Sequence, residues 1–163
     1  MIIRRAKSAD LDALGRLGLS MMRTHCAFDE RRYIPAEGDA EAVYSAFLAA
    51  FIDADDAVVL VAEETESEIV AYVYAAVEPP SFKELRDRAG FVHDLIVADG
   101  ARGGGVGHQL LEAAVQWLKE RGMPRVILWR AEQNTGAQRL FERRGFRRTM
   151  IEMTRELEDI GKP

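Results

Sequence analysis

A glycine-rich turn between a strand pattern and a helix pattern most limits how this chain of 163 residues can fold. Residues 91–97 are rich in β-branched and large apolar side chains, which predicts a mostly buried strand. Apolar residues from Leu110 to Leu118 recur at helical spacing. The segment between them contains five glycines, four of them within residues 103–107. A glycine loop that opens a helix presents unpaired N–H groups and the positive end of the helix dipole, a combination that binds phosphate.

The loop sequence narrows the choice of phosphate ligand. No Lys-Ser or Lys-Thr follows the glycines, so the nucleoside-triphosphate loop pattern is absent, and the dinucleotide glycine spacing also fails. An Arg-x-x-Gly-x-Gly pattern does fit, with Arg102, Gly105 and Gly107. This pattern resembles the pyrophosphate loop of the GNAT superfamily of N-acetyltransferases, which bind acetyl-coenzyme A. A tight turn that binds no ligand is the alternative interpretation.

A second motif of the same family lies downstream. GNAT proteins carry Asn-x-x-Ala-x-x-x-Tyr and then a helix end at Gly-Phe. The chain matches this pattern at Asn134, Ala137, Gly145 and Phe146, but it has Phe141 where many members have Tyr. Two motifs in the right order and at the right spacing make the resemblance specific.

The resemblance covers about residues 1–157, and its specific part is residues 91–146. It implies an α/β (mixed α+β) acyl-coenzyme A N-acyltransferase fold in one domain over residues 1–163, with helices on both faces of a central mixed sheet. The patterns predict the order β-α-α-β-β-β-α-β-α-β. Strands are predicted over residues 2–6, 57–62, 69–77, 91–97, 125–131 and 147–157. The four helices of this order are predicted over residues 8–24, after Asp39 with Val43, Phe47, Leu48 and Phe51 facing inward, over residues 108–121 and over residues 134–144. Asn134 is expected to cap the last helix and Gly145 to follow its end. A further short helix is predicted over residues 81–88.

Charge is distributed unevenly along the chain, whose formal net charge is −5. Residues 1–100 contain 10 Lys and Arg against 19 Asp and Glu, whereas residues 101–148 contain 10 against 4. A basic half that carries the glycine loop suits a polyanionic cofactor, and an acidic half suits a cationic second substrate. A solvated surface with uneven charge is the alternative. The acidic total argues against a nucleic-acid partner.

Other sequence features point to the setting in which the protein works. Cys26 is the only cysteine, which favours a reducing cytoplasm. No apolar run reaches the roughly 18 residues of a membrane span, and the first residues lack the layout of a signal peptide. The three histidines have no metal-ligand spacing. We therefore expect a cytoplasmic protein with neither a membrane segment nor a metal; a homodimer is left open.

The resemblance implies where acetyl-coenzyme A binds. In the family, the strand before the loop bulges, and its backbone N–H groups contact the acetyl carbonyl and the pantetheine amides. Spacing from the loop assigns these positions to Leu95 and Val97, so Leu95 would polarise the carbonyl as a one-donor oxyanion site. The implied cofactor-binding residues are Leu95, Ile96, Val97, Arg102, Gly103, Gly104, Gly105, Val106, Gly107, His108, Asn134, Ala137 and Phe141.

An alkylamine acceptor must lose a proton, because its pKa near 10.4 keeps it charged at neutral pH. His93 and Asp94 stand just before the carbonyl-binding position, and either could act as the base. Asp94 could instead orient His93 or attract the ammonium. Adjacent strand residues point to opposite faces, so the two share a pocket only if a bulge turns them. A plain structural role for either is the alternative.

Phe141 raises a question about the leaving group. In members with Tyr at this position, the hydroxyl is thought to protonate the departing coenzyme A, and Phe141 cannot do so. A general acid typically contributes about 10²–10⁴-fold, so its loss weakens activity without abolishing it. We therefore expect an acetyl-coenzyme A-dependent N-acetyltransferase acting on the primary amine of a small cationic molecule. A protein or peptide amine is the second acceptor, and a non-catalytic acyl-coenzyme A-binding module is the rival function.

Overall fold

The computed structural model describes residues 1–64 and 68–157. The chain forms two compact units, Met1–Gln133 and Asn134–Pro163. In the described part of the chain, no helix has both the length and the apolar composition needed to cross a bilayer.

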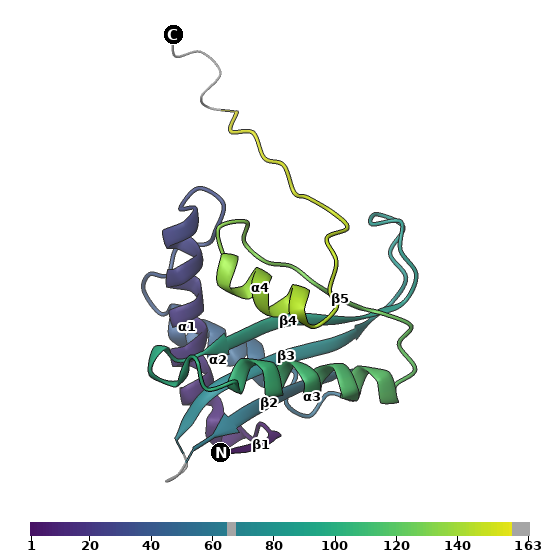
Figure 1. Ribbon diagram of the computed structural model, residues 1–163. Helices are drawn as coiled ribbons and strands as arrows, with labels where there is room; N and C mark the ends of the chain where they lie inside the picture. The colour runs from purple at the N-terminus through teal and green to yellow at the C-terminus, as the bar shows by residue number, and fades with distance from the viewer. Residues whose placement is uncertain (65–67, 158–163) are drawn as a thin grey trace. The chain divides into compact units, whose positions relative to one another are not determined.

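The first unit is built on one five-stranded sheet in the order β1-β2-β3-β4-β5 (Figure 1). Its strands are β1 (Ile2–Arg5), β2 (Ala57–Glu63), β3 (Ile69–Glu78), β4 (Ala89–Val97) and β5 (Val126–Leu128). The first four strands pair antiparallel, and β5 pairs parallel to β4. The parallel pair needs a crossover connection, which the helix after the glycine loop provides. The mixed sheet predicted from the sequence is therefore confirmed.

Helices cover both faces of this sheet, as predicted (Figure 1). On one face lie α1 (Leu11–Phe28), which follows the short η1 (Ser8–Asp10), and α2 (Ala40–Ala49). Leu14 and Leu48 from these helices are fully buried against Tyr72 of β3. On the other face lies α3 (Val106–Glu120), which follows η3 (Asp99–Ala101). A Cβ atom on Gly90 of β4 would come within 2.7 Å of Leu118, so glycine allows α3 to pack closely there.

The second unit contains α4 (Thr135–Arg143). Asn134 caps this helix, because its side-chain oxygen accepts a hydrogen bond from the Ala137 N–H at 3.1 Å. After the helix, Gly145 adopts φ +83°, the left-handed conformation expected of a residue just past a helix end. Phe146 then folds back on Phe141, with ring centroids 5.9 Å apart and a backbone hydrogen bond of 3.1 Å. The cap and the helix end are thus as predicted.

Two predicted elements are wrong. Residues 81–88 form no helix; the backbones of Ser81 and Arg86 exchange hydrogen bonds of 2.9 and 3.0 Å across a tight turn. The turn leaves Phe82 and Leu85 96% and 90% exposed, so they do not form the apolar face that a helix would bury. The strand predicted over residues 147–157 also does not form, since within the described residues no other strand pairs with it. Alternation favours a strand only where a partner completes the ladder.

Two helices differ in detail from their predictions. The first runs one turn beyond Thr24, and His25 lies in it with its Nδ1 atom 2.9 Å from the Met21 carbonyl oxygen. In α2, Leu48 is buried as predicted, but Val43 and Phe47 are largely exposed. Phe47 instead lies at the edge of the core, with its ring centroid 5.9 Å from that of Tyr74.

Candidate functional site

A bulge in β4 places His93 and Asp94 on the same face of the sheet. Asp94 is paired with Tyr74 of β3 and Val92 with Ala75, which leaves His93 as an extra residue between two consecutive pairs. The His93 ring stacks on Tyr74, and Asp94 bonds to Tyr44 of α2. Both side chains therefore lie on the α2 side, which the alternation of a regular strand would forbid. The bulge also breaks the regular parity by which His93 and Leu95 would share a face.

Asp94 is held by two tyrosine hydroxyl groups. Tyr44 and Tyr72 both donate to its Oδ2 atom, Tyr72 at 3.3 Å. Burial raises the pKa of the Asp94 carboxyl, and the two O–H donors offset part of that rise by stabilising the carboxylate. Burial and the nearby Asp94 charge likewise raise the pKa of both phenols, and they raise the pKa of Tyr74 to about 12. Both phenols therefore stay protonated near neutral pH and can keep donating to the Asp94 carboxylate.

We expect Tyr44→Phe to raise the pKa of Asp94 further, because the variant removes a hydrogen bond that stabilises the carboxylate. Carbon-13 NMR titration of the labelled Asp carboxyl measures this shift. Tyr74→Phe is the matched control. Tyr74 lies opposite Asp94 in the sheet, whereas the hydrogen bonds to the Asp94 carboxylate come from Tyr44 and Tyr72. An Asp94 titration unchanged in Tyr44→Phe would contradict the assignment.

His93 is more accessible than Asp94 and has a carboxylate partner. Its side chain is 32% exposed, and its Nε2 atom lies 3.0 Å from Oε1 of Glu78, the last residue of β3. The ring stacks between Tyr74 and Phe91, with centroids 4.9 and 5.5 Å away. Neither Glu78 nor Tyr44 was predicted as a site residue. Glu78 is 15 residues from His93 in the sequence, and Tyr44 is 50 residues from Asp94. The tertiary fold brings each pair together, and no local motif identifies either residue.

Beyond the bulge, the edge of β4 that faces β5 pairs with no strand of the described residues, and we call it the open edge. β5 pairs with β4 only at residues 90–92, whereas β4 continues to Val97. The Ala98 N–H donates to the Val70 carbonyl at 2.8 Å, so it points toward β3. Alternate residues of an antiparallel strand point to the same neighbour, so the N–H groups of Leu95 and Val97 point away from β3, to the open edge. An extended amide ligand can bind along such an edge.

The glycine loop leaves its backbone accessible at the start of α3. Gly103 and Gly105 have φ angles of +86° and +82°, which residues with a side chain rarely adopt. A Cβ atom built on either glycine would meet nothing within 4 Å, so the backbone there is accessible. Gly105 is the N-cap residue of α3 and has no side chain with which to cap the helix. Arg102 braces the loop, with its Nε atom donating to the Val97 carbonyl at 3.1 Å and an ion pair of 2.8 Å to Asp99. These features fit a pyrophosphate group.

The other predicted cofactor residues have varied surroundings. Val106 and Ile96 bury their side chains in the core, so only their backbones could contact a ligand. His108 lies in the first turn of α3, and its Nδ1 atom lies 3.7 Å from Oε1 of Glu112, one turn further along the helix. Asn134, Ala137 and Phe141 belong to the second unit, where Asn134 caps α4.

A mixed sheet with an open edge after a bulge, next to a glycine loop at a helix N-terminus, defines the acyl-coenzyme A N-acyltransferase class of folds. The model of the Acetyltransferase (GNAT) family matches residues 22–146 of this chain. The chain therefore belongs to the GNAT family of acetyltransferases.

Individual relatives agree with this assignment. The mycothiol acetyltransferase of Saccharomonospora viridis is 30% identical over 109 residues, which are 66% of this chain and 35% of that protein. The chain thus spans about a third of that relative's length. The uncharacterized N-acetyltransferase YhfO of Bacillus subtilis is 28% identical over 148 residues, 90% of this chain and 89% of its own. A tetramutant of the BH1408 protein of Bacillus halodurans has the same fold, with a TM-score of 0.84 at 22% identity over 96% of this chain and 100% of that one.

Proposed function

We propose that this protein transfers the acetyl group of acetyl-coenzyme A to the primary amine of a small cationic molecule in a ternary complex. The observation that carries the proposal is the open edge of β4, which lies between the bulge and the glycine loop. Membership of an acetyltransferase family supports the reaction. The acidic composition of residues 1–100 supports a cationic acceptor. We propose the whole chain as one catalytic domain.

The glycine loop and the first turn of α3 would bind the pyrophosphate through backbone N–H groups, and the edge of β4 would bind the pantetheine amides. Bound acetyl-coenzyme A supplies a thioester, whose carbonyl carbon bonds to the amine nitrogen while its carbon–sulfur bond breaks and the sulfur leaves as thiolate. The Leu95 N–H would stabilise the negative charge that develops on the carbonyl oxygen. Removing one such donor costs roughly 2.7–4 kcal/mol in analogous enzymes.

His93 is the proposed base that takes the proton of the amine. Its ring is partly exposed, whereas Asp94 is enclosed by Tyr44 and Tyr72. The enclosed Asp94 carboxylate would attract the ammonium before that proton is lost. The thiolate needs no protonation to depart, because a thiol pKa near 8.5 makes it a fair leaving group. The acetylated nitrogen then loses its second proton to the departed thiolate or to solvent. Phe141 is compatible with this mechanism.

The proposal predicts free thiol release when the protein is mixed with acetyl-coenzyme A and small diamines or polyamines. The free thiol is measured with a chromogenic thiol reagent, and mass spectrometry detects the acetylated amine. Turnover should require the amine, and neutral analogues in which the second amino group is replaced by a hydroxyl should react less well. Peptides with free lysine or N-terminal amines form the second arm of the assay.

Two outcomes would contradict the proposal. Faster acetylation of peptides than of small amines would identify a protein or peptide acceptor. A melting temperature that rises with coenzyme A, without thiol release from any amine, would identify a binding module instead.

A further inference from the structure

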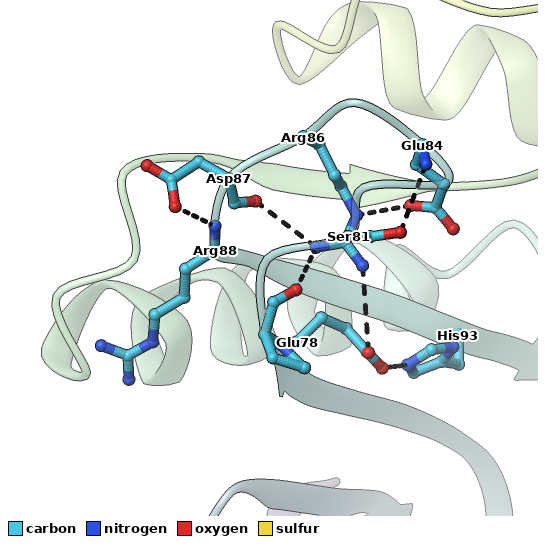
Figure 2. Close-up of polar contacts among 8 residues, drawn as sticks. Glu78, Ser81, Glu84, Arg86, Asp87, Arg88 and His93 are labelled. Carbon is cyan, nitrogen blue, oxygen red and sulfur yellow. Dashed lines mark hydrogen bonds and ion pairs between the residues drawn. The ribbon is translucent and has the colours of Figure 1, made fainter.

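The imidazole of His93 is held in one orientation. It stacks between Tyr74 and Phe91 with interplanar angles of only 23° and 21°, so the two aromatic rings restrict rotation of the imidazole plane. Figure 2 shows the ring pointing at Glu78, whose Oε1 atom lies 3.0 Å from Nε2. A side chain fixed both in plane and by one nitrogen presents its other nitrogen in a defined direction.

The partner of Nε2 determines the tautomer of this ring. An ionised Glu carboxylate only accepts hydrogen bonds, so Nε2 must carry the proton that it donates. A neutral imidazole then has Nδ1 as its acceptor, and Nδ1 has no hydrogen-bond partner among the described residues. Nδ1 is therefore the nitrogen that can take up a proton.

Arg86 contacts both Glu78 and Phe91, two residues that hold the His93 ring, and Figure 2 shows its contact with Glu78. The Nη2 atom of Arg86 lies 4.0 Å from Oε2 of Glu78, and its Cζ atom lies 4.7 Å from the centroid of the Phe91 ring. It also donates to the Pro79 carbonyl at 2.8 Å. The tight turn that was predicted as a helix over residues 81–88 brings Arg86 to this position, because Ser81 and Arg86 pair through their backbones.

We propose that Glu78 is a positioning residue that holds His93 with its proton on Nε2, so that Nδ1 accepts the proton of the acceptor amine. This inference rests on the proposed function. The amine loses one proton, Nδ1 gains it, and the resulting imidazolium keeps its Nε2–H bonded to Glu78. The negative charge of Glu78 then stabilises the imidazolium, as a carboxylate does for a catalytic histidine in hydrolases.

Glu78→Gln tests this proposal without a change in side-chain size. Arg86 offers only donors, so the new amide is expected to turn its oxygen toward Arg86 and its NH₂ group toward His93. His93 must then accept at Nε2, which moves its proton to Nδ1 and removes the acceptor. Nitrogen-15 NMR of labelled histidine should show Nε2–H in the wild type and Nδ1–H in the variant. We expect kcat to fall by about 10–100-fold, the range reported for partners that orient a histidine, with the KM for acetyl-coenzyme A unchanged.

Glu84→Gln is the matched control, because Glu84 bonds to Arg86 in the same turn, whereas the Nε2 partner of His93 is Glu78 (Figure 2). It should keep both the Nε2–H tautomer and the turnover. Glu78→Ala is the second variant; without an acceptor for Nε2–H, its histidine should show both tautomers. An Nε2–H signal that is the same in wild type, Glu78→Gln and Glu78→Ala would overturn the inference, and so would an unchanged kcat.

The two readouts separate this inference from the proposed function. If the wild type acetylates amines but Glu78→Gln keeps its tautomer and kcat, the positioning role is wrong and the function stands. If the wild type acetylates no amine, the proposed function is wrong. The NMR spectra then still decide whether Glu78 sets the tautomer of His93.

Discussion

His93→Gln is expected to lower kcat by about 10²-fold or more, which is the contribution of a general base. Glutamine keeps the approximate size of histidine and can still bond to Glu78, but its amide accepts no proton at neutral pH. Binding of acetyl-coenzyme A should change little, because the proposed cofactor contacts lie further along the chain, from Leu95 onward. Steady-state kinetics of the purified variant and calorimetry with coenzyme A measure the two effects.

The pH dependence provides a second test of His93. In the wild type, kcat/KM should rise with pH through one ionisation of an imidazole in the free enzyme, combined with the titration of the amine. In His93→Gln the imidazole step should disappear. Higher pH should partly restore turnover, because more of the amine is then already neutral. Near-normal kcat and an unchanged pH profile would remove His93 from the mechanism.

Asp94→Asn is the comparison that separates the two candidate bases. Asparagine can still accept hydrogen bonds from Tyr44 and Tyr72, so the fold around it should be kept. If Asp94 only attracts the ammonium, the variant should mainly raise the KM for the amine. A loss of kcat larger than that of His93→Gln would instead move the base to Asp94.

Elements specified by neighbouring residues could be predicted from the sequence. The left-handed conformation of Gly145 and the capping of α4 by Asn134 depend on the chemistry of a few adjacent residues, and both have the expected geometry. Within residues 91–118, the apolar residues follow a strand pattern and then a helical pattern, and the glycine loop marks the boundary between the two. The family resemblance, counted back from Arg102, assigned cofactor binding to Leu95 and Val97. Their N–H groups point to the open edge of β4, and their contact with a cofactor stays a prediction.

Contacts that arise from tertiary folding could not be predicted in this way. The family resemblance implied a bulge in this strand, but its position at His93 becomes visible only when β3 and β4 are paired, and it decides which side chains share a face. Glu78 reaches His93 because β3 and β4 are neighbours, and Tyr44 reaches Asp94 because α2 packs on the sheet. Residues 147–157 alternate like a strand, but a strand also requires a partner.

Gly107→Val is expected to weaken coenzyme A binding by at least about 10-fold, which corresponds to 1.4 kcal/mol. Gly107 is the second residue of α3, where the backbone N–H groups would contact the pyrophosphate. A branched side chain there would fill the space through which the phosphates approach the backbone. The variant should remain folded, because valine in a helix is no less favourable than glycine. Gly105→Val is a poorer test, since φ +82° would strain any side chain.

The control for this experiment is Gly100→Ala in η3, where a Cβ atom would meet nothing within 4 Å and φ is not left-handed. It should bind coenzyme A like the wild type. Calorimetry gives the affinity of each variant, and circular dichroism confirms that each is folded. If Gly107→Val is folded and binds coenzyme A as tightly as Gly100→Ala does, the phosphates do not contact this turn. The cofactor would then have to bind elsewhere, and the open edge of β4 beside the loop would need a different explanation.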